Sequence, residues 1–106
     1  MSADSGRRER RIAAERQLLA ALCQGSLDDE SREELLRRLE KHVFAMPDHE
    51  VVFDALRKLP AMKAERMREA LAATVTRMGF PDVDLNLFFE PHAVARGTMA
   101  DLLREL

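Results

Sequence analysis

Tryptophan and tyrosine are absent from this sequence, and the only aromatic residues besides histidine are five phenylalanines. Residues with branched β-carbons are also few. Apart from the short stretch Val83, Leu85 and Leu87, no alternating apolar pattern appears that would indicate a half-buried β-strand. Alanine, leucine, glutamate and arginine dominate instead, and all four favour the α-helix. Because 106 residues suffice for one hydrophobic core, we expect a single all-α domain.

Cysteine occurs once, at Cys23, which excludes an internal disulfide and favours a reducing compartment. Long hydrophobic runs are missing as well. The stretch Leu18–Cys23 is among the longest, and it is far below the ~20 apolar residues that span a bilayer. The basic start of the chain is not followed by the apolar segment of a secretory signal. The sequence therefore predicts a cytoplasmic protein without a membrane segment.

Glycine is scarce and widely scattered. The four glycines are Gly6, Gly25, Gly79 and Gly97. None of them begins a phosphate-binding loop of the form G-x-x-x-x-G-K-[ST], in which successive backbone amides surround the phosphates of a nucleotide. ATP hydrolysis is therefore excluded by the residues as well as by the length of the chain.

Histidine occurs three times, at His42, His49 and His92. A zinc site built from His42 and His49 would need Cys23 or a carboxylate as a further ligand, but the spacings match no ligand pattern. Nothing in the sequence orients Cys23 beside a histidine base, and we expect it to be a small buried hydrophobic residue. We interpret His49 as a residue that hydrogen-bonds locally and braces the preceding loop. No catalytic, cofactor-binding or metal-binding residue is predicted, and the chain is not expected to be an enzyme.

The net charge is only −2, so the basic excess of a general nucleic-acid binder is missing. Charge is nevertheless unevenly distributed. A basic cluster near the amino terminus consists of Arg7, Arg8, Arg10 and Arg11. It has no interleaved aromatic residues, so we interpret it as the solvated start of a helix and keep a nucleic-acid-binding arm as the alternative. Residues 28–34 form an acidic block, and acidic residues suit the first turn of a helix.

Residues 47–59 satisfy several independent rules for an α-helix. Pro47 suits the first helical position, because proline lacks the amide hydrogen that would have no partner there. Acidic residues in the first turn and basic residues in the last turn complement the helix dipole. The apolar stripe consists of Val52, Phe53, Leu56 and Leu59. Pro60 ends the element, so this helix is expected to pack one face against a partner element.

Two blocks of this sequence carry a resemblance to a known family. The first has the pattern F-x-x-P-x-H-x-x-V-F-x-A-L-x-x-L, and its matched positions include Phe44, Pro47, His49, Phe53 and Ala55. The second opens with an acidic residue and continues as a leucine-rich helix, at Glu15, Leu18, Leu19, Ala21 and Leu22. Up to Pro60, the blocks and their spacing resemble the N-terminal domain of DnaB-type replicative helicases. The helicase-binding C-terminal domain of bacterial primases, which has the same fold, has a looser version of this pattern.

Helices are also expected before this segment. The first spans residues 8–24, with Gly25 as a left-handed cap at its carboxyl end. Ser26 and Asp29 have the spacing of a capping box, which predicts that a second helix follows and runs to about His42. Its expected apolar stripe is Leu35, Leu36, Leu39 and Val43.

Two further helices are expected after Pro60. One spans residues 61–78 and ends at Gly79, with Met67, Leu71, Val75 and Met78 at helical spacing. Thr98 and Asp101 offer the start of a last short helix that reaches Leu106. The sequence thus predicts a compact bundle of about five to six short helices, similar to the helicase N-terminal domain. Residues 1–7 are expected to be a disordered polar and basic arm, and residues 8–106 the domain.

The segment from Phe80 to Pro91 holds more apolar residues than one narrow face of a short helix accommodates. Some of them should point away from the core and form a surface for a partner, unless the helix is buried on all sides. The predicted partner-binding residues are Val83, Leu85, Phe88 and Phe89 as apolar anchors, with Glu30 and Glu34 steering the partner.

Together these observations favour a non-catalytic protein–protein interaction module that needs no cofactor. The resemblance implies self-association around a ring, or docking between helicase and primase in DNA replication, without the motor part of the helicase. The expected partners are a replicative helicase, a primase or a second copy of the chain, and no membrane. The alternative is a small nucleic-acid-binding regulatory protein that uses the basic amino-terminal arm, with an affinity for DNA that falls steeply with salt.

Overall fold

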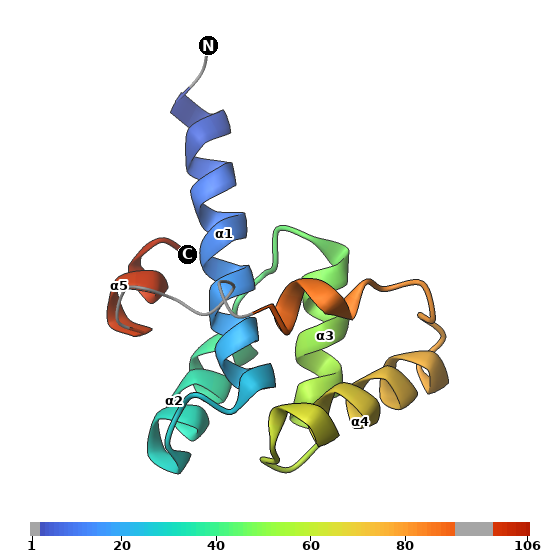
Figure 1. The fold of residues 1–106 in the computed structure, drawn as a ribbon. Helices are drawn as coiled ribbons and strands as arrows, with labels where there is room; N and C mark the ends of the chain where they lie inside the picture. Colours follow the sequence, from blue (N-terminus) through green and yellow to red (C-terminus); the bar gives the residue numbers. More distant parts are fainter. Residues whose placement is uncertain (1–2, 91–98) are drawn as a thin grey trace.

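Helix α1 (Ala3–Gln24) is the longest element and runs through the middle of the molecule. The computed structural model describes residues 3–90 and 99–106. Figure 1 shows α2 and α5 on one side of α1, and α3, α4 and the short 3-10 helix η1 on the other. The bounds of these elements are α2 (Asp29–Glu40), α3 (Pro47–Arg57), α4 (Ala64–Arg77), η1 (Leu85–Phe88) and α5 (Met99–Arg104). The described ranges contain no β-strand, which confirms a compact all-α fold.

The amino-terminal half of α1 projects beyond the other helices (Figure 1). The helix begins at Ala3 and not near Arg8, so residues 3–7, which we expected to belong to a disordered arm, are helical. It ends before Gly25, whose φ of 65° lies in the left-handed region that favours glycine. The predicted cap at the carboxyl end of α1 is therefore confirmed.

The start of α2 differs from the sequence-based prediction. Asp28 is the N-cap, and its side chain accepts a hydrogen bond of 2.7 Å from the backbone N–H of Ser31. The predicted Ser26–Asp29 capping box is wrong, since the Ser26 hydroxyl donates to the carbonyl oxygen of Ala21 instead. The chain needs extra residues to turn from α1 into α2, which moves the cap from Ser26 to the next suitable acceptor.

The end of α2 also differs. The helix stops at Glu40, and the chain crosses to α3 through residues 41–46. Leu35 and Leu39 are buried as predicted, but Val43 is 78% exposed. Val43 fits the helical spacing of the stripe, yet it lies beyond the end of the helix, where that spacing no longer decides the direction of a side chain.

Helix α3 follows the sequence-based prediction closely. Pro47 is its first helical residue, as expected, and Met46 precedes it as the N-cap. Its buried residues include Val52, Phe53 and Leu56 from the predicted stripe. The helix ends at Arg57, before Leu59, so the boundary is shorter than predicted while the buried face is confirmed.

The second half of the chain contains α4, η1 and α5. Met67, Leu71 and Val75 of α4 are buried as predicted, and Gly79 follows the helix with a φ of 96°. The ambiguous stretch around Leu85 is a 3-10 helix and not a strand. Helix α5 has no fully buried residue but packs leucines against the core. The predicted start of this last helix at Thr98 lies outside the described residues.

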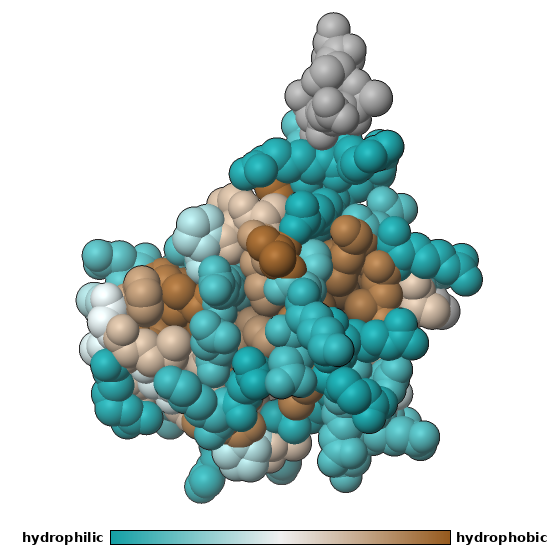
Figure 2. All heavy atoms as spheres, turned by 180° about the vertical axis from the view of Figure 1, so that it is seen from behind, coloured by the Kyte–Doolittle hydropathy of each residue, from teal (hydrophilic) through white to brown (hydrophobic). Residues whose placement is uncertain are grey.

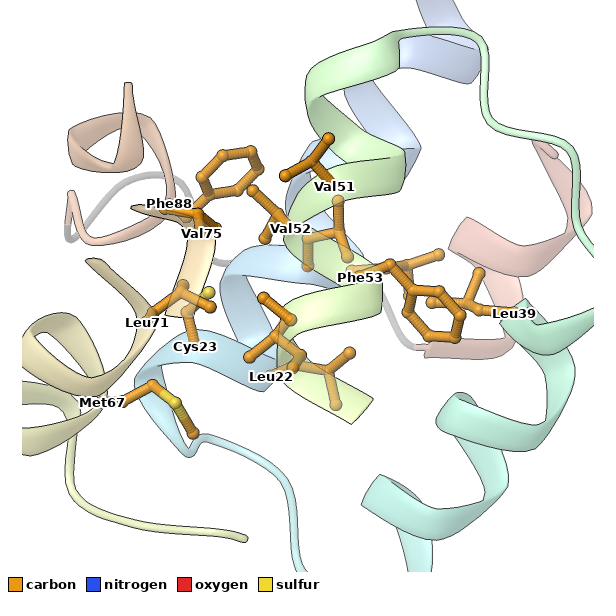
Figure 3. Packing of buried hydrophobic residues seen from close by; sticks show 14 of the residues in the cluster. Leu22, Cys23, Leu39, Val51, Val52, Phe53, Met67, Leu71, Val75 and Phe88 are labelled. Atoms are coloured by element: carbon orange, nitrogen blue, oxygen red, sulfur yellow. The ribbon is translucent and has the colours of Figure 1, made fainter. Parts of the chain in front are cut away.

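All the helices except α5 contribute fully buried residues to one hydrophobic core (Figure 3). Helix α1 supplies a buried strip that includes Leu18, Leu22 and Cys23, and α3 packs against it. Helix α4 and η1 close one side of the core, and α2 closes the other.

Candidate interaction surface and the buried Glu15 cluster

Glu15 is an acidic side chain at the centre of α1, and it is completely buried. Its carboxylate accepts hydrogen bonds from His42 Nε2 at 2.6 Å and from His49 Nδ1 at 2.9 Å. The backbone N–H of Ala45 lies 3.0 Å from one carboxylate oxygen and 3.2 Å from the other. Arg11, one helical turn earlier, places Nε 3.6 Å from the carboxylate. These groups, which we call the Glu15 cluster, join α1 to the α2–α3 connection and to α3.

Opposing effects act on the pKa of the Glu15 carboxyl. Burial raises it, because a charge is poorly solvated inside the protein. The hydrogen bonds from His42, His49 and the Ala45 N–H lower it, and together they hold the pKa below its ordinary value. The carboxylate is therefore ionised at neutral pH, and each histidine needs only one ring N–H to donate to it.

Sequence reasoning missed the role of His49. We expected local hydrogen bonding, but His49 reaches a carboxylate 34 positions away in the sequence. Glu15 and His49 lie in the two sequence blocks that prompted the expected likeness to helicases. Their presence in these blocks is the one sequence feature that could have indicated a contact between them. Within the described residues, no group of three or more histidine, cysteine, aspartate or glutamate side chains could hold a metal ion. What the structure shows of the cluster is a set of contacts that join α1 to the α2–α3 connection and to α3.

The basic cluster near the amino terminus is largely used within the chain. Arg11 donates to the carbonyl oxygen of Val43, and Arg8 donates to that of Ala45 at 3.5 Å. Arg10 pairs with Glu105 beyond α5 at 3.6 Å. Arg7 is exposed. Three of the four arginines predicted for a nucleic-acid arm therefore bind other parts of this domain.

The residues after α4 form a surface that is only partly apolar. Phe88 is 1% exposed and belongs to the core, whereas Val83, Leu85 and Phe89 are half-buried against it. The exposed apolar side chains here are Phe80, at 46%, and Leu87, at 41%. Of the four predicted apolar anchors, three are therefore partly exposed and Phe88 is a core residue, while the two most exposed apolar residues, Phe80 and Leu87, were not among them. We call the five residues Phe80, Val83, Leu85, Leu87 and Phe89 the η1 surface.

Side chains from α1 and α4 hold the η1 surface in place. Gln24 Nε2 donates to the carbonyl oxygens of Phe88 and Glu90, at 3.0 and 2.9 Å. Arg68 of α4 donates to the side chain of Asn86, and its guanidinium lies 5.7 Å from the centre of the Phe89 ring. The segment is thus fixed although it contains only one short helix.

The acidic residues predicted to steer a partner do not lie beside this surface. Glu30 and Glu34 belong to α2, which Figure 1 shows across α1 from η1. Glu30 is exposed, and Glu34 pairs with Arg37 and Arg38 on the same helix. The hydrogen bonds that Arg38 and Arg37 donate to it lower the pKa of the Glu34 carboxyl. The predicted combination of apolar anchors and acidic residues is therefore not assembled in one place.

Apolar areas on the face shown in Figure 2 are separated by hydrophilic side chains. A pocket of about 440 Å³ lies between the end of α1 and the start of α4, and its lining includes Gly25, Met62 and Lys63. In the part of the chain that the structure describes, no helix is long and apolar enough to cross a membrane. The molecule thus offers several small surfaces for contact.

Comparison with known proteins leaves the family of this chain open. No protein-family model, no curated protein and no solved structure matches it.

Proposed function

We propose that this chain is a non-catalytic protein–protein interaction module. In this proposal it resembles the N-terminal domain of replicative helicases and the helicase-binding domain of primases, and it mediates self-association or helicase–primase docking. The observation that carries the proposal is the η1 surface, in which Phe80 and Leu87 are exposed among half-buried apolar neighbours. Aromatic and large aliphatic side chains of this kind contribute most of the binding energy in protein interfaces.

The way the η1 surface is held also supports binding. Gln24 fixes the backbone at Phe88 and Glu90, and Arg68 contacts Asn86 and the Phe89 ring. A partner therefore does not have to order this segment when it binds, which reduces the entropic cost of association. A flexible apolar loop would lose much of its binding energy in that step.

The reactive side chains give no support for an enzyme. Cys23 is fully buried, and burial raises the pKa of its thiol to about 12, so it is not a nucleophile at neutral pH. His42 and His49 both donate to Glu15 inside the domain. The two histidines are thus engaged with a buried carboxylate of the domain itself.

The alternative is a small nucleic-acid-binding regulatory protein. The projecting amino-terminal half of α1 is basic, which favours this alternative, but Arg8, Arg10 and Arg11 all have partners within the chain. Titration of labelled single-stranded and duplex DNA at two salt concentrations separates the two functions. We expect no binding at physiological salt, whereas a nucleic-acid binder would show an affinity that falls steeply as salt rises.

The main experiment introduces a charge into the η1 surface. We expect Leu87→Asp and Phe80→Asp to leave the helical circular dichroism unchanged, because both side chains are substantially exposed. Each should weaken binding to a replicative helicase, to a primase or to a second copy at least about tenfold, since a charge is then buried in an apolar contact. Light scattering after size exclusion measures the complexes.

Ala73→Asp is the matched control, since it adds the same charge at an exposed position of α4 that is not on the helix face of Arg68, the residue that contacts the η1 surface. It should bind as the unaltered chain does. Equal binding by Leu87→Asp, Phe80→Asp and the control would contradict the proposal. A chain that binds neither enzyme and stays monomeric at all concentrations would contradict it too.

A further inference from the structure

Val43 is the most exposed of the large apolar residues in the described part of the chain, at 78%. It lies in the α2–α3 connection, and the backbone around it is fixed by side chains of α1. Arg11 binds the carbonyl oxygen of Val43, and Arg8 binds the carbonyl oxygen of Ala45. Glu15 accepts from the Ala45 N–H and from the ring of His42. An exposed apolar side chain on a fixed loop is already ordered for a partner.

Several positively charged side chains lie near Val43 in the sequence or against its loop. Lys41 precedes it, and the guanidinium groups of Arg8 and Arg11 lie against its own loop. Arg7 is one helical turn from Arg11 on the same face of α1 and is exposed. A complementary partner therefore combines a small apolar hollow with acidic side chains at its rim. A nucleic-acid backbone has the complementary negative charge, but it provides no apolar contact for the Val43 side chain.

This chain itself contains a hollow of that description. A pocket of about 430 Å³ lies along α2, from Glu30 in its first turn to Arg37 in its last, beside Met99 at the start of α5. Its apolar lining comes from Met99, and its rim carries Glu30, Glu33 and Glu34, with Arg37 and Ser31 completing the lining. Glu34 is paired with Arg37 and Arg38, so the negative charge of the rim comes mainly from the exposed Glu30 and Glu33. The pocket thus offers an apolar contact beside acidic side chains, which complement in charge the basic side chains near Val43.

We propose that the Val43 loop of one chain docks into the α2–α5 pocket of a second copy. One chain does not make this contact internally, because Val43 is 78% exposed and does not line the pocket. The contact uses different surfaces on the two copies, so a bound pair keeps a free pocket on one copy and a free loop on the other. Such head-to-tail contacts build rings when the rotation closes and open chains when it does not.

This inference rests on the proposed interaction function, but it uses a surface separate from the η1 surface. The two can therefore fail independently. Loss of self-association in Val43→Asp but not in Leu87→Asp supports docking through the Val43 loop. The reverse result overturns docking through Val43 and leaves the interaction function intact.

Sedimentation at several protein concentrations tests the proposal. We expect self-association that weakens as ionic strength rises from about 0.01 M to about 0.15 M, since the Debye length then falls from roughly 30 to roughly 8 Å. Val43→Asp should weaken it at least about tenfold, because the change removes the apolar contact and adds repulsion to the acidic rim. Val43→Ile should retain it. A chain that stays monomeric at low salt overturns the proposal.

A mixing experiment tests the head-to-tail arrangement. The double variant Glu30→Lys with Glu33→Lys reverses the charge at the pocket. The double variant Arg7→Glu with Lys41→Glu reverses the charge near the Val43 loop. Neither double variant should self-associate, but the two should bind each other when mixed, because one keeps an intact loop and the other an intact pocket. Glu65→Lys with Glu69→Lys, two exposed positions of α4, is the matched control and should self-associate normally. Absence of any complex in the mixture overturns the proposal.

Discussion

Glu15 shows how a charged side chain is tolerated in the interior of a small domain. An ionised carboxylate loses the solvation of water when it is buried, and only donors from the protein can replace it. Here the donors come from two histidine rings and a backbone N–H, with Arg11 as a nearby positive charge. The carboxylate in turn satisfies the polar groups of the α2–α3 connection.

Glu15→Gln is expected to destabilise the domain by about 3 kcal/mol, because the amide is neutral and its NH₂ group cannot accept from the donors around it. Urea unfolding followed by circular dichroism measures the change. Glu69→Gln, at an exposed position of α4, is the matched control and should change the free energy of unfolding by less than about 0.5 kcal/mol. A Glu15→Gln variant as stable as the control would contradict this role.

The stability provided by Glu15 should depend on pH with a defined sign. The folded-state pKa of its carboxyl is lowered from the ordinary value of 4.5, so the unfolded chain binds this proton more readily than the folded one. The contribution is complete above the ordinary value and is lost as pH falls through the folded-state pKa. Urea unfolding at a series of pH values measures the free energy of unfolding of the unaltered chain and of Glu15→Gln. The difference between the two free energies should become smaller in acid. A difference in the free energy of unfolding that stays constant or grows in acid would contradict this prediction.

At the scale of the elements, the backbone chemistry of single residues decides where the helices begin and end. Asp28 caps α2 and Pro47 begins α3. Gly25 ends α1 in the left-handed region, and the chain passes close to another connection there. An added Cβ at Gly25 would lie 3.3 Å from the carbonyl oxygen of Met62, so both conformation and space favour glycine.

Gly25→Ala is therefore expected to destabilise the domain by about 1–2 kcal/mol, since alanine is strained at positive φ. Thermal or urea unfolding measures the loss. Gly6→Ala is an informative comparison, because Gly6 lies within α1 and an added Cβ would make only an ordinary contact of 3.5 Å with Arg10. That change should leave stability unchanged or raise it, as alanine favours the helix. Equal effects at both positions would refute the argument from positive φ.

At the scale of the whole molecule, the neighbouring residues Leu87 and Phe88 have opposite environments. Phe88 is 1% exposed, packs in the core and places its ring 5.8 Å from that of His49, whereas Leu87 is 41% exposed. Removal of a buried phenylalanine side chain leaves a cavity, so Phe88→Ala should cost about 3–5 kcal/mol. Leu87→Ala should cost less than about 1 kcal/mol. Urea unfolding of both variants checks this order, and a larger loss for Leu87→Ala would reverse the assignment of core and surface.

The thiol of Cys23 reports on the folding of the whole domain. It is fully buried, and its pKa is raised to about 12 by burial, so the reactive thiolate is suppressed in the folded state. We expect a thiol reagent such as Ellman's reagent to label Cys23 only when the domain opens, at a rate that rises with urea. Rapid labelling in the absence of urea would show that the core around Cys23 opens locally.

The local rules were sufficient for much of the fold. Gly25, Pro47 and Gly79 act on the backbone within a few residues, so their effects could be predicted without knowledge of the rest of the molecule. The buried face of α3 could be predicted for the same reason, since helical spacing alone places its side chains. The start of α2 was harder, because Ser26 and Asp28 are both good caps and the turn after α1 chooses between them.

The sequence by itself determined an all-α chain, the positions of its helices and most of the residues that each helix buries. Only the tertiary structure decided that Glu15 meets His42 and His49, that Phe88 turns inward while Leu87 remains exposed, and that Val43 projects from a fixed loop. Helix formation depends on neighbours a few residues apart, whereas these contacts depend on how whole helices lie against one another. The candidate surfaces belong to this second class, because exposure is a property of the packed molecule.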